Sequence, residues 1–208
     1  MTLLYNGYCY SRVLCEKGFN YIYQAEIKRY IETDRIYGKN GGILTSLYNL
    51  TMNSNHIVNS LYLGNAYNAR DYYSLKNNNI GMIVNCTIDV DNYFEDTNEF
   101  EYVRVDVYDN NEASILKYLD NTVDSINDFL TKNPHKNILV HCFMGSSRSA
   151  TIIIAYMIKY LNYTRREALS YIKNKRDIVN LNINFFKELK KYENSLKNSS
   201  NLYTQQGF

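Results

Sequence analysis

From residue 57 onward, apolar and polar positions alternate in a way that predicts short strands separated by helices. EYVRVDV (101–107) has valine at every second position, which is the period of a half-buried strand. SILKYLDNTVDSINDFL (114–130) repeats its apolar residues every three or four positions, which predicts an amphipathic helix. The same patterns predict a strand pair over 57–64, a helix over 68–78, and short apolar strands over 81–86 and 137–142.

The segment 147–161 is apolar on nearly every side, as expected for a helix buried at the centre of a domain. Two further helices are expected, from Thr164 and from Asn184. Strands that alternate with helices predict an α/β fold, with a central, mostly parallel sheet flanked by helices. Ligands of such sheets bind beyond the carboxyl ends of the strands.

The first 54 residues differ from this pattern. Apolar and charged residues recur at helical spacing over 20–37, and a glycine-containing joint, GKNGG (38–42), follows. We expect 1–54 to be an N-terminal extension with an amphipathic helix, which either packs on its own chain or serves as a homodimerisation arm. The rest of the chain divides into one folded domain, 55–200, and a polar tail, 201–208.

Composition narrows the environment of the protein. The 208 residues carry a formal net charge of +2, which gives little electrostatic reason to expect binding to nucleic acid or to a membrane surface. The four cysteines fit neither a disulfide framework nor a zinc site. With no signal peptide and no apolar run long enough to span a bilayer, a cytoplasmic protein is expected. Abundant Asn, Tyr, Ile and Lys indicate an AT-rich genome, of which some protozoa, bacteria and large DNA viruses are possible sources.

The segment HCFMGSSRSA (141–150) concentrates reactive and polar residues where an apolar strand gives way to an apolar helix. Backbone N–H groups of such a loop converge near the positive end of the helix dipole, where they favour an anion and lower the pKa of a thiol. Cys142 is therefore the candidate nucleophile. The planar guanidinium of Arg148 can hold two oxygens of a phosphate, and Gly145 permits a tight loop. A polar turn around a structural cysteine is the alternative.

The loop contains the pattern His-Cys-x5-Arg-Ser, which is the signature of the cysteine-dependent protein phosphatases. It is intact here as His141, Cys142, Gly145, Arg148 and Ser149. A chance match of these five positions in a chain of this length is on the order of 10⁻⁴.

From about residue 55 to 196 the chain resembles the dual-specificity phosphatase family. IVNSLYLGNAYNARD and IGMIVNCT are similar to the family's first strands, and LSYIKNKRDIVNLNINFFKEL to its closing helices. The resemblance implies a protein tyrosine phosphatase-like fold and chemistry that needs no metal and no cofactor. The family usually has a proline before the asparagine of the closing segment, where this chain has Leu181-Asn182.

The resemblance also implies roles for the loop. Cys142 would form a phosphocysteine intermediate, Arg148 would clamp the transferring group, and Ser149 would hydrogen-bond to the sulfur as it leaves. His141 would hydrogen-bond around the cysteine backbone and help to tune the thiolate. The phosphate would be held, mainly by backbone amides, at Phe143, Met144, Gly145, Ser146, Ser147 and Arg148.

A general acid must protonate the leaving oxygen. The family takes it from an aspartate that follows the strand before the long helix, and Asp106 and Asp109 are the two candidates here. Asp106 lies within EYVRVDV, where we expect a sheet face to hold its side chain. Asp109 follows the expected end of that strand, and its distance from the helix matches the family without a gap, so it is the preferred acid.

The loop residues also bear on the substrate. Phe143, Met144, Ser146 and Ser147 are apolar or neutral, whereas phosphoinositide phosphatases of this superfamily commonly have lysines there. RNA 5′-phosphatases typically have an asparagine before the arginine, which this loop lacks. The resemblance therefore implies a protein phosphatase acting on phosphotyrosine and phosphoserine/threonine. An RNA 5′-triphosphatase and a non-catalytic phosphoprotein-binding module remain the alternatives.

Cys86 ends the apolar segment 81–86 as Cys142 ends 137–142. If these two strands are neighbours, both sulfurs lie at the same edge of the sheet, within the reach of a disulfide. Some phosphatases of the superfamily have a resolving cysteine at the end of the equivalent strand, and this chain resembles them there. Cys86 is either such a redox partner or a small buried apolar residue.

Overall fold

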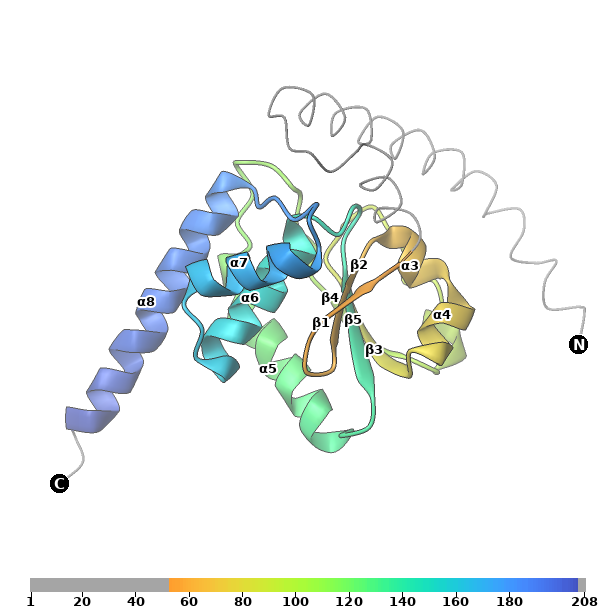
Figure 1. Ribbon diagram of the computed structural model, residues 1–208, viewed down its shortest axis with the longest axis horizontal. Coiled ribbons are helices and arrows are strands. Elements are labelled where there is room, and N and C mark those ends of the chain that lie inside the picture. The colour runs from red at the N-terminus through yellow and green to blue at the C-terminus, as the bar shows by residue number, and fades with distance from the viewer. Residues whose placement is uncertain (1–52, 206–208) are drawn as a thin grey trace, which may run out of the picture. The chain divides into compact units, whose positions relative to one another are not determined.

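A five-stranded sheet forms the centre of the folded domain (Figure 1). The computed structural model describes residues 53–205. The strands lie in the order β1-β2-β5-β3-β4; β1 is antiparallel to β2, and the other neighbours are parallel. The strands are β1 (Asn55–Val58), β2 (Leu61–Gly64), β3 (Ile80–Asn85), β4 (Glu101–Arg104) and β5 (Asn137–His141). The predicted α/β fold with a mostly parallel sheet is confirmed.

Helices cover both faces of the sheet (Figure 1). On one face α3 and α4 pack against β2, β3 and β5, and on the other α6 packs against β2 and β5 with α5, α7 and α8 around it. The helices are α3 (Ala66–Arg70), α4 (Tyr72–Asn77), α5 (Leu116–Lys132), α6 (Arg148–Leu161), α7 (Arg165–Lys175) and α8 (Ile183–Gln205). A 3-10 turn, Glu95–Thr97, precedes β4.

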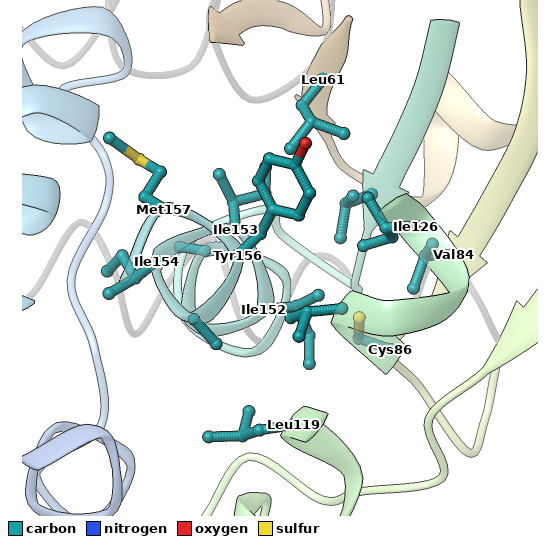
Figure 2. Close-up of a cluster of buried hydrophobic side chains, with 14 of the residues drawn as sticks. Leu61, Val84, Cys86, Leu119, Ile126, Ile152, Ile153, Ile154, Tyr156 and Met157 are labelled. Carbon is teal, nitrogen blue, oxygen red and sulfur yellow. The ribbon is translucent and has the colours of Figure 1, made fainter. Parts of the chain in front are cut away.

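The buried helix predicted over 147–161 is α6, the central element of the larger core. Every residue from Arg148 to Ile158 is buried. Burying a large aliphatic side chain contributes about 1.5–3 kcal/mol, so this helix has a fixed place in the domain. Its first residue, Arg148, is therefore held in position by the core. Figure 2 shows side chains projecting from α6 in several directions, among them Ile152, Ile153, Ile154, Tyr156 and Met157.

Three predicted elements differ in extent. The single helix expected over 68–78 is wrong: Asp71 ends α3, and its carboxylate then accepts a hydrogen bond from Ser74 N to cap α4. The strand expected over 101–107 ends at Arg104, although the chain stays bonded to β3 through Val105 N and Asn85 O at 2.9 Å. At the other end of the domain, α8 continues to Gln205, into the segment expected to be a polar tail.

The amphipathic helix expected over 20–37 lies outside the described residues. So does the rest of the expected extension 1–54, up to residue 52. Within 53–205, none of the helices combines the length and the apolar character that a membrane crossing requires. The same part of the chain has no group of three or more His, Cys, Asp or Glu residues that could hold a metal ion.

Candidate active site

The loop 142–147 joins the carboxyl end of β5 to the first residue of α6. The Cys142 thiol is buried and accepts two hydrogen bonds, from Gly145 N at 3.2 Å and from the Ser149 hydroxyl at 3.2 Å. Gly145 has φ +71°, a conformation that favours glycine. A Cβ at this position would also lie 2.4 Å from Gly64 O, so the loop packs directly on the end of β2.

The surroundings of Cys142 favour its thiolate. Burial alone would raise the pKa of this thiol, but the Arg148 guanidinium and the hydrogen bonds of Ser149 outweigh it and lower the pKa below the ordinary value. His141 does not supply the positive charge, because burial lowers its pKa to about 3 and leaves the ring neutral, its hydrogen bond with the Cys142 backbone acting in the opposite direction. The imidazole is therefore an uncharged neighbour of the thiolate that is hydrogen-bonded to the Cys142 backbone.

Arg148 is buried beside the loop, with 8% of its surface exposed. Its Nη1 donates to Val107 O at 3.3 Å, which ties the helix start to the segment after β4. Its Nε lies 3.7 Å from Asp109 Oδ2 and makes no hydrogen bond with any described residue. A buried N–H without a partner carries a desolvation cost, and a phosphate oxygen would remove it.

Asp109 faces the same loop from the segment after β4. Its Oδ1 accepts hydrogen bonds from the Ser147 hydroxyl at 2.9 Å and from Asn182 Nδ2 at 3.4 Å. Its Oδ2 faces Arg148, the residue expected to bind the phosphate. With Oδ1 used by two donors, Oδ2 is the oxygen that would carry the proton if Asp109 is the acid.

Asp106 is differently placed from what the sequence led us to expect. It lies beyond the end of β4, not in a strand, and its side chain is 54% exposed. The carboxylate is paired with Arg104 Nε at 2.9 Å. It is therefore engaged away from the Cys142 loop, while Asp109 is directed to it.

Ser147 does more than supply the backbone amide expected of it. Its hydroxyl donates to Asp109 and accepts from Asn182 N at 3.1 Å. One side chain thus joins the loop 142–147, called the phosphate loop below after its predicted role, to the candidate acid and to the start of α8. The turn at Leu181-Asn182 forms without the family's proline. The Asn182 carboxamide caps α8 by accepting from Asn184 N at 2.8 Å, and its Nδ2 donates to Asn110 O at 2.6 Å.

Glu188 of α8 has a supporting role that the sequence did not indicate. Its buried carboxylate accepts hydrogen bonds from Ile115 N at 2.8 Å, Leu116 N at 3.1 Å and the Ser114 hydroxyl at 2.7 Å. It thereby caps the start of α5 across 72 to 74 residues of sequence. A negative charge is stabilising at a helix N-terminus. The segment that carries Asp109 is thus fixed at its far end.

Arg176 is a second buried residue whose role the sequence did not indicate. Only 1% of its surface is exposed, and it donates to the carbonyl oxygens of Met144 and Gly145 in the phosphate loop. It lies 28 residues after Arg148 in a charged stretch, KNKRD, in which nothing marks one arginine for burial.

The two cysteines occupy matching positions, as the sequence suggested. β3 and β5 are parallel neighbours with Asn85 beside His141, and Cys86 N donates to His141 O at 2.8 Å. Both thiols are buried and unbridged. Cys86 also belongs to the core around α6 (Figure 2).

Comparison with known proteins identifies this arrangement. Residues 61–195 match the family model for the dual specificity phosphatase catalytic domain. Protein phosphatase Slingshot of Drosophila melanogaster is 38% identical over 140 residues, which cover 67% of this chain but 13% of that protein. Dual specificity protein phosphatase 14 of Mus musculus is 36% identical over 146 residues, covering 70% of this chain and 72% of that protein.

A solved structure agrees. The crystal structure of DUSP15 matches with a TM-score of 0.64 at 29% identity, covering 74% of this chain and 97% of the DUSP15 chain. The family match extends over well more than half of the sequence and includes the loop with Cys142 and Arg148. The chain belongs to the dual specificity phosphatase family of the cysteine-dependent protein tyrosine phosphatases.

Proposed function

We propose that this protein hydrolyses phosphotyrosine and phosphoserine/threonine in protein substrates through a phosphocysteine intermediate. One observation carries the proposal: Arg148 lies 3.7 Å from Asp109, and its two chain neighbours, Ser147 and Ser149, hydrogen-bond to Asp109 at 2.9 Å and to Cys142 Sγ at 3.2 Å. Cys142, Arg148 and Asp109 supply a nucleophile, an anion clamp and a proton donor around the loop that would hold the phosphate.

In the first step, the Cys142 thiolate attacks phosphorus and a P–S bond forms as the P–O bond to the leaving oxygen breaks. Asp109 gives its proton to that oxygen, so tyrosine or serine departs as a neutral hydroxyl. In the second step water attacks phosphorus, Asp109 takes a proton from it, and the P–S bond breaks. The sulfur leaves as a thiolate that the Ser149 hydroxyl stabilises through the hydrogen bond already present.

Two other functions use the same loop. An RNA 5′-triphosphatase would act on a terminal phosphate, and a non-catalytic module would bind phosphoproteins without turnover. Purified protein should be assayed on a phosphotyrosine peptide, a phosphothreonine peptide and a 5′-triphosphate RNA. We expect phosphate release from both peptides. Release from the RNA alone, or tight peptide binding without release, would replace the proposal by the corresponding alternative.

We also propose a redox function for Cys86, which its position beside the end of β5 and Cys142 supports. Burial first, and then the nearby Cys142, raise the pKa of Cys86 well above its ordinary value, so this thiol is neutral at rest. Peroxide would oxidise the Cys142 thiolate to a sulfenic acid and be reduced to water. The Cys142 charge is lost in that step, so one of the causes that hold Cys86 protonated disappears. Cys86 could then attack the sulfenic sulfur, form the disulfide and release water.

We therefore expect peroxide-treated protein to recover most of its activity when dithiothreitol reduces the disulfide. Cys86→Ser should recover several-fold less activity, because the Cys142 sulfenic acid would have no Cys86 thiol to react with and would be oxidised further to irreversible forms. The measurement is phosphatase activity before peroxide, after peroxide and after dithiothreitol, for both proteins. Equal recovery would leave Cys86 as a packing residue.

The N-terminal extension is proposed to form a homodimer. The support is its amphipathic pattern over 20–37 and the GKNGG joint that would let the helix reach a second copy. We expect light scattering to give a dimeric mass for the full chain and a monomeric mass after deletion of residues 1–50. A monomeric full chain at micromolar concentration would contradict this.

A further inference from the structure

The phosphate loop is held from outside by hydrogen bonds to its carbonyl groups. Four successive carbonyl oxygens each accept one. The donors are Ala66 N to Phe143 O at 3.2 Å, Arg176 Nη2 to Met144 O at 3.2 Å, Arg176 Nε to Gly145 O at 3.0 Å, and Asn180 N to Ser146 O at 3.1 Å.

These bonds determine where the loop's N–H groups point. A peptide unit is planar and trans, so its C=O and N–H point in opposite directions. A carbonyl bonded on the outer side of the loop therefore turns the N–H of the following residue inward. The peptide between Met144 and Gly145 shows this: its oxygen accepts from Arg176, and its N–H donates to Cys142 Sγ at 3.2 Å.

Arg176 controls two of these four peptide units with one side chain. It lies just after α7, and its guanidinium is also bonded to Asn55 Oδ1 at 2.6 Å and to Asn53 O at 3.3 Å near β1. Three nitrogens of a rigid planar group are thus used at once. Burying a charged group is costly, so a side chain that only joined β1 to α7 could have been apolar.

We propose that Arg176 is a positioning residue for phosphoryl transfer: it fixes the peptide units 144–145 and 145–146 so that their N–H groups face the Cys142 sulfur and the bound oxyanion. In this role Arg176 acts through the peptide units of the loop and is not itself a catalytic residue. Without it, either peptide unit could turn its carbonyl oxygen toward the thiolate, which would repel both the thiolate and a phosphate. The proposal rests on the proposed function only for the identity of the anion.

The test compares Arg176→Met and Arg176→Lys with the parent in two measurements that require no turnover. The pH dependence of Cys142 alkylation by iodoacetamide reports the pKa of the Cys142 thiol. Calorimetric titration with tungstate reports how tightly the loop binds an oxyanion. In Arg176→Met we expect the titration midpoint of Cys142 to rise by about one pH unit or more and tungstate to bind about tenfold more weakly. Arg176→Lys keeps the charge without the planar fork, so it should lie between the two.

Arg165→Met is the matched control. Arg165 is also largely buried, but its guanidinium contacts Glu193 at 3.7 Å and stacks over Phe186 instead of meeting the loop. Its substitution should leave both measurements unchanged. A folded Arg176→Met protein with the parent's titration midpoint and tungstate affinity would overturn the proposal, even if its activity fell.

If Arg176→Met does not fold, Asn55→Ala decides the question. This substitution removes the acceptor that orients the guanidinium. The acid dissociation constant of Cys142 and the affinity for tungstate should each fall about threefold, in the same direction as in Arg176→Met. Parental values in folded Asn55→Ala would then refute the proposal. Neither measurement depends on hydrolysis. A parent protein without phosphatase activity would therefore overturn the proposed function, while the role of Arg176 would still be decided by Cys142 alkylation and tungstate binding.

Discussion

Replacing Cys142 by serine should reduce turnover of p-nitrophenyl phosphate roughly 10⁴-fold or more, as loss of a nucleophile does in other enzymes that form covalent intermediates. The structure lowers the pKa of a thiol at this position, mainly through the Arg148 guanidinium and Ser149 hydrogen bonds that oppose burial. The same surroundings cannot ionise a serine hydroxyl near neutral pH. The measurement is the initial rate of the parent and of Cys142→Ser, with circular dichroism as the check on folding.

Cys86→Ser is the control, because Cys86 is an equally buried cysteine at the end of the neighbouring strand. It should keep near-parental activity under reducing conditions. Arg148→Lys should lose about 10²- to 10³-fold, since a point charge cannot reproduce the two-pronged contact of a guanidinium. Substantial activity in Cys142→Ser would rule out the phosphocysteine mechanism.

The reactive centre could be predicted because its parts are close in sequence. Cys142, Gly145, Arg148 and Ser149 lie on one loop and one helix start, and the apolar runs on either side reveal the strand and the helix that hold them. Strand order could not be obtained in the same way. That β3 lies beside β5, and so places Cys86 near Cys142, depends on how the whole sheet assembles.

The supporting residues are missed for a related physical reason. Glu188, Asn182 and Arg176 bond to residues at least 31 positions away in the sequence, through hydrogen bonds that leave no periodic pattern. Each belongs to a residue type that is usually exposed, so sequence alone favours a solvated side chain. The burial of Glu188 and Arg176 shows only in the folded chain, where all three residues satisfy backbone groups of the loop or of helix ends.

Local chemistry also overrode periodicity in places. Asp71 stands within an apparently continuous helical pattern, yet its carboxylate bonds to the backbone and starts a new helix. Aspartate competes for backbone donors in this way, which is why it favours caps over helix interiors. The shortening of β4 had a consequence for the site, because it leaves Asp106 outside the strand, paired with Arg104.

Asp109→Asn should slow hydrolysis of a phosphothreonine peptide by about 10²-fold or more, which is the usual contribution of a general acid. An alkoxide is a poor leaving group and needs the proton, whereas p-nitrophenolate leaves without one, so the loss on p-nitrophenyl phosphate should be clearly smaller. An amide retains hydrogen bonds to Ser147 and Asn182 but has no acidic proton to give.

Two comparisons give this prediction its sharpness. Asp106→Asn should have little effect on either substrate, because the Asp106 carboxylate is exposed and paired with Arg104. Ser147→Ala should follow the pattern of Asp109→Asn with a smaller loss, about tenfold, because it removes the shorter of the two hydrogen bonds to Oδ1 and lets the carboxyl group rotate away from the leaving oxygen. If Asp106→Asn were selective for the phosphothreonine peptide and Asp109→Asn were not, the proton would come from Asp106. The loop after β4 would then have to rearrange when substrate binds, because Asp109 is the carboxylate that faces Arg148 and Ser147 in the structure.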